Sequence, residues 1–339
     1  MPGHSIKLIP QQQTFISGSK QSILDAVLGA GINISHGCSS GRCGKCIARL
    51  IKGNIQPTRH SDFPLSQAQK EAGFFVSCCY SARSTLEIEI QTINSIGQLN
   101  EQQINSRVYR IKKLREDVIA LTLKTPRNQH LEFLAGQYIT VDFGNGLRRN
   151  KSLANCPCES MKLEIHVQHH SNDPFSDYVF RHLKKNDVVK LHGPWGEFTL
   201  VEKSDRPLLF IAYDTGFASI KSLLEQAIAL DWEQSIELYW LNTRNTKPYL
   251  ENYCRSLVDA FDNISFISIN ISPDQPLQTS VALQQIITQR KSRLASDIFA
   301  ALPASHFPDI KQLLHQVDKQ SQSRLQLDYI APVPDQEPA

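Results

Sequence analysis

The sequence lacks a long apolar run, a basic cluster and a large net charge. Its longest uninterrupted apolar stretches, such as Leu208 to Tyr213, are far shorter than the roughly 20 residues that cross a bilayer. Residues 1–13 contain no apolar segment of the kind found in a signal peptide, so no such leader is expected. The net charge of +3, from 36 Lys and Arg against 33 Asp and Glu, is too small to indicate a nucleic-acid partner.

What the chain does have is the composition of an ordinary globular protein. Apolar residues make up 41% and charged residues 20% of its 339 residues. This length is sufficient for two or three domains, each with its own core. We therefore expect a soluble multidomain protein without a membrane span.

Three cysteines stand close together near the N-terminus. Cys38, Cys43 and Cys46 follow the spacing C-x4-C-x2-C, and Cys78 and Cys79 come about thirty residues later. Plant-type [2Fe–2S] ferredoxins use this spacing, with three thiolates on one loop and a fourth from a later segment. Such a loop must wrap its cluster closely, and glycines between the cysteines allow turns that a side chain would block. These glycines are residues 37, 41 and 44.

Zinc is the alternative metal for these cysteines. Three clustered cysteines and a distant fourth can bind Zn²⁺ tetrahedrally and give a purely structural site. Zinc sites more often have paired C-x2-C knuckles, and the cysteine loop contains one such pair, so the pattern favours the iron–sulfur cluster. Cysteines committed to a cluster fit a reducing compartment better than a disulfide framework, which predicts a cytoplasmic protein.

The segment around this loop predicts a β-grasp domain over residues 1–95. The expected elements are strands at 5–9, 14–16, 47–51 and 86–90, a helix that Ser22 caps and Gly31 ends, and a short helix at 66–71. This block resembles the [2Fe–2S] ferredoxin domain of the ferredoxin-fused flavin reductases, which belong to the ferredoxin–NADP⁺ reductase superfamily. In that family the fourth ligand stands eight residues before the Leu of the closing strand. Counted back from Leu86, the resemblance implies Cys78 as ligand and Cys79 as a small buried neighbour.

A polar linker is expected at 95–103, and residues 104–203 resemble the FAD-binding β-barrel of the same reductases. The family pattern R-x-Y-S-x-x-N contacts the FAD pyrophosphate through its Arg and the flavin through its Tyr and Ser. The resemblance assigns Arg149, Ser152 and Asn155 to this pattern, with Lys151 in the Tyr place. Lys151 replaces an aromatic face by a flexible cation, which would favour an anionic reduced flavin.

A second phosphate contact of the family is G-x-F-S at the start of a short helix. In this chain Asp173 replaces the Gly, while Phe175 and Ser176 are kept. The N-terminus of a helix suits pyrophosphate because its free N–H groups and dipole favour anions. A carboxylate at that place partly offsets the benefit, and the resemblance implies FAD contact through Ser176.

Residues 205–330 predict a parallel-sheet α/β domain. Strands are expected at 208–212, 236–241, 264–269 and 325–329, with helices at 219–230, 249–261 and near 279–290. The domain resembles the NAD(P)H-binding domain of these reductases, which carries G-G-T-G after its first strand. Here that loop has Tyr213 and Asp214 in place of two glycines and keeps only Thr215 and Gly216. An aspartate near a pyrophosphate costs roughly 1–4 kcal/mol, depending on the effective dielectric.

The predicted fold is multidomain, α+β and α/β: a β-grasp [2Fe–2S] ferredoxin domain, an antiparallel FAD-binding β-barrel and a parallel-sheet nucleotide-binding-like domain. Residues 331–339, rich in Pro and acidic residues, are expected to form a disordered tail. The resemblance implies a reductase that passes electrons from NAD(P)H through FAD to the cluster and on to a partner oxygenase or dehydratase. The alternative is an electron carrier or scaffold whose nucleotide site has decayed and which another donor reduces. No catalytic side chain is assigned.

Overall fold

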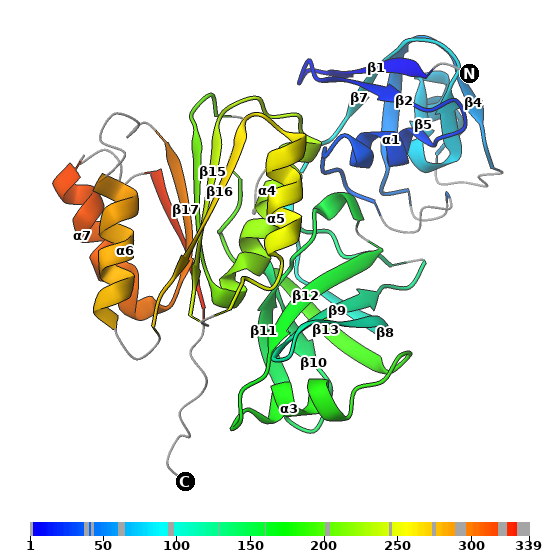
Figure 1. Ribbon diagram of the computed structural model, residues 1–339. Helices are drawn as coiled ribbons and strands as arrows, with labels where there is room; N and C mark the ends of the chain where they lie inside the picture. Colours follow the sequence, from blue (N-terminus) through cyan, green and yellow to red (C-terminus); the bar gives the residue numbers. More distant parts are fainter. Residues whose placement is uncertain are drawn as a thin grey trace.

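A computed structural model gives the fold of the chain (Figure 1). It describes residues 3–36, 41, 44–59, 65–93, 98–127, 129–159, 161–200, 204–243, 246–272, 276–288, 296–317 and 324–330. Two of the predicted cluster ligands, Cys38 and Cys43, and the predicted tail at 331–339 lie outside these residues. Three units follow one another along the chain, coloured from blue through green to red in Figure 1.

The first unit has the predicted β-grasp architecture. Its elements are β1 (His4–Ile9), β2 (Thr14–Ser17), α1 (Ile23–Gly29), β3 (Ile47–Lys52), β4 (Ile55–Pro57), α2 (Gln67–Glu71), β5 (Phe74–Val76), the 3₁₀ helix η1 (Ser77–Cys79), β6 (Tyr80–Ala82) and β7 (Leu86–Ile90). The main sheet has the order β2-β1-β7-β3-β5, in which β1 and β7 are parallel. The alternating residues of β7 place Leu86 and Ile88 in the core, where Ile23 and Val27 of α1 also lie.

The second unit is an antiparallel barrel. Its elements are β8 (Gln102–Arg115), β9 (Val118–Lys124), β10 (Tyr138–Asp142), β11 (Arg148–Ser152), the 3₁₀ helix η3 (Pro157–Glu159), β12 (Lys162–Gln168), α3 (Pro174–Arg181) and β13 (Val188–Trp195). The strands have the order β11-β10-β13-β8-β9-β12, and a bridge between Leu153 and Ile165 joins the two ends. Strand β8 begins inside the predicted linker, because Gln102 and Gln103 pair with Gly193 and His192 of β13.

The third unit is an α/β domain with a fully parallel sheet. Its elements are β14 (Leu208–Tyr213), the 3₁₀ helix η4 (Asp214–Gly216), α4 (Phe217–Ala229), β15 (Ile236–Asn242), α5 (Glu251–Ala260), β16 (Ile264–Asn270), α6 (Pro276–Thr288), β17 (Asp297–Leu302), the 3₁₀ helix η5 (Ala304–His306), α7 (Phe307–Val317) and β18 (Leu325–Tyr329). The order is β16-β15-β14-β17-β18, with α4 and α5 on one face and α6 and α7 on the other (Figure 1). Strand order reverses between β14 and β17, which is where α/β sheets bind ligands.

The three units meet at one junction. Helix α1 of the first unit packs on η3 of the barrel, and Leu230 at the end of α4 packs against the core of the first unit. A cavity of about 330 Å³ lies at this junction, and its walls include Ile93, Leu134 and Trp232, one from each unit. In the part of the chain that the structure describes, none of the helices combines the length and apolar composition needed to cross a bilayer.

Candidate functional site

The described part of the cysteine site brings together two thiols from distant segments. Cys46, just before β3, and Cys78, in η1, are each 2% exposed, and their side chains lie within hydrogen-bonding reach. The backbone N–H of Ser77 donates to the carbonyl of Cys46 at 2.9 Å, which fixes the two segments side by side. The hydrogen bond between the Cys46 and Cys78 side chains, together with burial, raises the pKa of the Cys46 thiol.

The described residues of the site fit their part of the donor set that a [2Fe–2S] cluster requires. Gly41 and Gly44 have φ of +82° and +73°, so the loop uses the left-handed turns for which the sequence supplied glycines. Cys79 is fully buried, with its Sγ 3.7 Å from the Sγ of Cys78. Both cysteines therefore point into the same region, and the assignment of Cys78 rather than Cys79 stays a prediction. If a cluster is bound, Cys46 and Cys78 would supply two of its four thiolates.

A glutamate of the barrel contacts three residues that flank the predicted cysteine loop. Glu132 Oε1 accepts hydrogen bonds from Ser35 Oγ at 3.1 Å and from the backbone N–H of His36 at 3.2 Å. Lys45 Nζ, next to Cys46, forms an ion pair with the same oxygen at 3.1 Å. We call Glu132 with these three donors the Glu132 clasp. Its donors come from the residues just before the cysteine loop, Ser35 and His36, and from Lys45 just before Cys46. No local pattern in the sequence indicated these contacts.

The residues predicted to hold the FAD pyrophosphate are brought together, but an internal carboxylate lies among them. Arg149 Nη2 is 2.8 Å from Asp173 Oδ1, and Asp173 also caps α3 by accepting from the N–H groups of Phe175 and Ser176. Burial alone would raise the pKa of Asp173, but the hydrogen bond from Ser176 and the charge of Arg149 lower it. Asp173 is therefore ionised and occupies both anion-binding elements of this region.

Lys151 lies beside the same cluster. Its Nζ is 5.7 Å from the centre of the Phe175 ring, and burial lowers its pKa. The charge of Asp173 acts in the opposite direction. Lys151, Arg149 and Ser176 thus surround one carboxylate.

The structure places Ser152 and Asn155 in different surroundings. Ser152 Oγ donates to Asp328 Oδ2 of β18 at 3.3 Å, so it faces the third unit. Burial raises the pKa of Asp328 to about 6. The Asn155 side chain instead bonds three backbone groups of its own barrel, at Cys156, Lys162 and Glu164. Asn155 therefore fixes the turn between β11 and β12.

The loop after β14 is tied down by Asp214. Its carboxylate accepts hydrogen bonds from the backbone N–H of Thr243 at 2.9 Å and from the Thr243 hydroxyl. Asp214 has a φ of +42°, a conformation that glycine adopts more readily. Gly216 is packed against the ends of β17 and β18, since an added Cβ would lie 2.4 Å from Ile330 Cδ1. Thr215 lies between Asp214 and Gly216 in the chain and is half-buried.

Tyr213 and His306 flank the other side of this loop. Their ring centres are 6.3 Å apart across the carboxyl ends of β14 and β17, where the strand order reverses. Burial raises the pKa of Tyr213 to about 12, so its hydroxyl stays neutral. An aromatic ring, that of Tyr213, and the carboxylate of Asp214 thus stand where the resemblance places two glycines.

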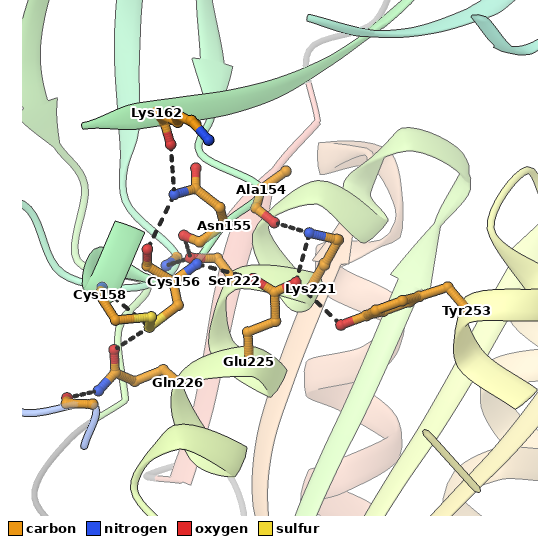
Figure 2. Close-up of a disulfide and its surroundings, with 12 residues drawn as sticks. Ala154, Asn155, Cys156, Cys158, Lys162, Lys221, Ser222, Glu225, Gln226 and Tyr253 are labelled. Carbon is orange, nitrogen blue, oxygen red and sulfur yellow. Dashed lines mark hydrogen bonds and ion pairs between the residues drawn. A yellow bond between two sulfur atoms is a disulfide. The ribbon is translucent and has the colours of Figure 1, made fainter. Parts of the chain in front are cut away.

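A buried ionic network joins the barrel to the third unit (Figure 2). Lys221 Nζ of α4 lies 3.3 Å from Glu164 Oε1 of β12 and 2.7 Å from Glu225 Oε1, and it donates to the carbonyl of Ala154 at 2.8 Å. Burial alone would raise the pKa of Glu164, but His166 and Lys221 lower it to about 2. The network holds the two units in fixed contact.

Comparison with known proteins identifies two of the three units. Residues 6–83 match the family of 2Fe-2S iron-sulfur cluster binding domains. Residues 105–200 match the family of oxidoreductase FAD-binding domains. The two matches agree with the β-grasp unit and the barrel described above.

Curated relatives share most of the chain. The CDP-6-deoxy-L-threo-D-glycero-4-hexulose-3-dehydrase reductase of Yersinia pestis is 32% identical over 236 residues, which cover 70% of each chain. Reductase component 1 of the terephthalate 1,2-dioxygenase of a Comamonas species is 31% identical over 237 residues, again 70% of each chain. Both relatives are named as reductases.

Solved structures show the same fold. The Amycolatopsis cytochrome P450 reductase GcoB has a TM-score of 0.58 at 19% identity, covering 98% of this chain and 100% of that one. Phthalate dioxygenase reductase has a TM-score of 0.55 at 20% identity, covering 67% of this chain and 68% of that one. The chain therefore belongs to the ferredoxin-fused flavin reductases, oxidoreductases in which NAD(P)H, FAD and a [2Fe–2S] cluster form one path for electrons.

Proposed function

We propose that this protein is the reductase component of a two-protein system and that it delivers electrons to a separate oxygenase or dehydratase. The relatives named for a hexulose dehydrase and for a dioxygenase support this partner class. NAD(P)H supplies electrons in pairs, a [2Fe–2S] cluster takes them singly, and FAD converts one mode to the other. The work of the polypeptide is to hold the two cofactors in contact.

The Glu132 clasp is the observation that carries this proposal. It joins Ser35, His36 and Lys45 to the FAD-binding barrel through one carboxylate oxygen. An electron carrier whose ferredoxin domain is connected to the barrel only by a flexible linker would need no such contact. The clasp instead suits transfer within the chain, since it holds Lys45, the neighbour of the predicted ligand Cys46, against the barrel.

A second candidate function is that of an electron carrier which another donor reduces. The specific observation that favours it is Asp214, whose negative charge lies in the loop after β14, where the family's nucleotide binds. The hydrogen bonds from Thr243 hold this carboxylate in the loop. This arrangement favours weak nucleotide binding more than loss of binding, so we retain the reductase as the main proposal.

Anaerobic titration of the holoprotein separates the two candidates. Under the reductase proposal, NADH or NADPH bleaches first the flavin and then the cluster absorbance. If neither nucleotide at millimolar concentration bleaches either chromophore, while dithionite bleaches both, the reductase proposal is wrong. The spectrum of the purified protein also tests the cluster, because a zinc protein without flavin would be colourless.

A further inference from the structure

Two cysteines that the proposed electron path does not use lie at the junction of all three units. Cys156 and Cys158 flank Pro157 and are joined by a disulfide in η3 (Figure 2). Helix η3 belongs to the barrel and packs against α1 of the ferredoxin unit and against α4 of the third unit. A chemical change in this pair therefore acts where the units touch.

Cys156 is connected to the ferredoxin unit through one side chain. Its Sγ lies 3.4 Å from Gln226 Oε1 of α4, and Gln226 Nε2 donates a hydrogen bond to the carbonyl of Gly31, which follows α1. The backbone N–H of Cys156 is held by Glu225 Oε2 at 3.0 Å. The sulfur, the carboxamide and the Gly31 carbonyl thus form a chain of contacts across three units (Figure 2).

The two oxidation states of the pair differ at the first link of this chain. A disulfide sulfur carries no proton, so in the oxidised state Gln226 Oε1 faces an acceptor. In the dithiol state the Cys156 S–H donates to Gln226 Oε1 and fixes the carboxamide with its N–H groups toward Gly31. The contact between Gln226 and Gly31 is present with the disulfide formed, and reduction of the pair would add a donor that holds the carboxamide in this orientation.

The pair is also open to a thiol reagent on one side. Cys156 is 3% exposed, whereas Cys158 is half-buried. An incoming thiolate therefore reaches Cys158 Sγ, and the buried Cys156 is the leaving group. The Cys158 backbone N–H lies 3.2 Å from the Cys156 Sγ, in position to stabilise the thiolate that leaves.

We propose that Cys156 and Cys158 form a thiol–disulfide site that a dithiol reductant opens, and that the reduced pair tightens docking of the ferredoxin unit through Gln226. One thiolate of the reductant attacks Cys158, the S–S bond breaks, and Cys156 takes up a proton. The second thiol of the reductant then closes its own disulfide and releases Cys158 as a thiol. Two electrons and two protons pass from the reductant to the pair.

Alkylation of the full-length holoprotein tests the redox step. The protein is equilibrated anaerobically with a series of reduced-to-oxidised dithiothreitol ratios, quenched with acid, alkylated with N-ethylmaleimide in denaturant so that buried thiols also react, and mapped by peptide mass spectrometry. We expect Cys156 and Cys158 to gain label together, with one shared midpoint, while the buried free thiol Cys254 of α5 does not follow the ratio. Label on both cysteines at every ratio, or on neither at the most reducing ratio, overturns the proposal.

Hydrogen exchange of the segment 28–33 tests the coupling to docking. Reduction should slow this exchange by about threefold, as expected for one weak hydrogen bond. Q226A should abolish the difference without changing the alkylation midpoint, and C158S, whose Cys156 stays a thiol, should exchange at the slow rate at every ratio. Equal exchange in both states of the unsubstituted protein overturns the coupling, and this measurement needs no variant to fold.

Discussion

The carboxylate of Asp173 lies 2.8 Å from the guanidinium of Arg149 while it caps α3. An arginine and a helix N-terminus are the two elements with which this barrel would hold a pyrophosphate. Here both are already satisfied by one internal anion. Bound FAD must therefore compete with Asp173, or share Arg149 with it, and FAD binding is weaker than the two elements alone would give.

Replacing Asp173 by asparagine should strengthen FAD binding. Asparagine keeps one of the two oxygens that cap α3, so one of the two capping hydrogen bonds remains, and it removes the negative charge beside Arg149. We expect D173N to bind FAD about tenfold more tightly, which corresponds to ~1.4 kcal/mol. Titration of flavin-free protein with FAD, followed by flavin fluorescence, measures the change.

Riboflavin provides the matched control for D173N, because it has the flavin ring without phosphate. Its affinity should be the same for D173N and for the unsubstituted protein. An equal gain for FAD and riboflavin would mean that Asp173 acts on the ring site rather than on the pyrophosphate.

The Glu132 clasp should control how fast the cluster is reduced from the flavin. E132Q loses the ion pair with Lys45 but keeps an oxygen that can accept from Ser35 and His36. Since Lys45 is half exposed and Glu132 is mostly buried, the loss is about 1–2 kcal/mol of docking free energy. We expect cluster reduction after flavin photoreduction to be several-fold slower in E132Q.

E71Q is the matched control for the clasp, since Glu71 is exposed on α2 of the same unit. Added salt should slow the unsubstituted protein and E71Q but have little effect on E132Q, because salt screens the Lys45–Glu132 pair. If E132Q reduces its cluster as fast as E71Q at low salt, the clasp does not position the loop.

The titration of Asp328 should make stability depend on pH in a defined window. Burial raises its folded-state pKa to about 6 from an ordinary 3.8, so the folded protein holds a proton that the unfolded chain releases. This contribution is complete below about pH 3.8 and is lost as the pH rises through 6. Above that pH a charged carboxylate lies half-buried beside Ser152.

D328N keeps the acceptor for Ser152 without the charge, so it should be more stable than the unsubstituted protein at pH 7.5. Because Asp328 is only half-buried, we expect about 1–2 kcal/mol rather than the roughly 3 kcal/mol of full desolvation. Urea unfolding at pH 4 and 7.5 measures it, with the exposed D262N as control. A D328N advantage that is equal at both pH values would contradict this account.

The fold was predictable wherever a local pattern carried it. Residues 86–90 and 325–329 alternate or run apolar and form β7 and β18 with the predicted bounds. Helix α7 was not predicted, although Pro308 in its first turn is compatible with a helix start and Ile310 and Leu314, four residues apart, are fully buried. Strand β8 extends into the predicted linker because pairing with β13 overrides a glutamine-rich sequence.

The site was only half predictable, for a different reason. The sequence identified Arg149, Ser152 and Asp214 but not their partners, since these depend on barrel register and on how the units dock. Ser152 meets Asp328, 176 positions away, and Asp214 meets Thr243 at the end of the neighbouring strand. No local pattern encodes such pairs. The sequence therefore located residues of the site, including one that departs from the family pattern, but it did not indicate which groups form hydrogen bonds or ion pairs with them.

Replacing Asp214 by glycine should improve NAD(P)H binding. Glycine adopts the φ of +42° without strain and removes the negative charge from the loop after β14. We expect the KM for NADH or NADPH to fall about tenfold in D214G, with a smaller change in kcat, because the substitution alters binding of the ground state. T243V is the control, since it removes the hydroxyl that binds Asp214 but leaves the carboxylate in place, and its KM should stay high. A KM for D214G no lower than that of T243V would show that the carboxylate does not limit nucleotide binding.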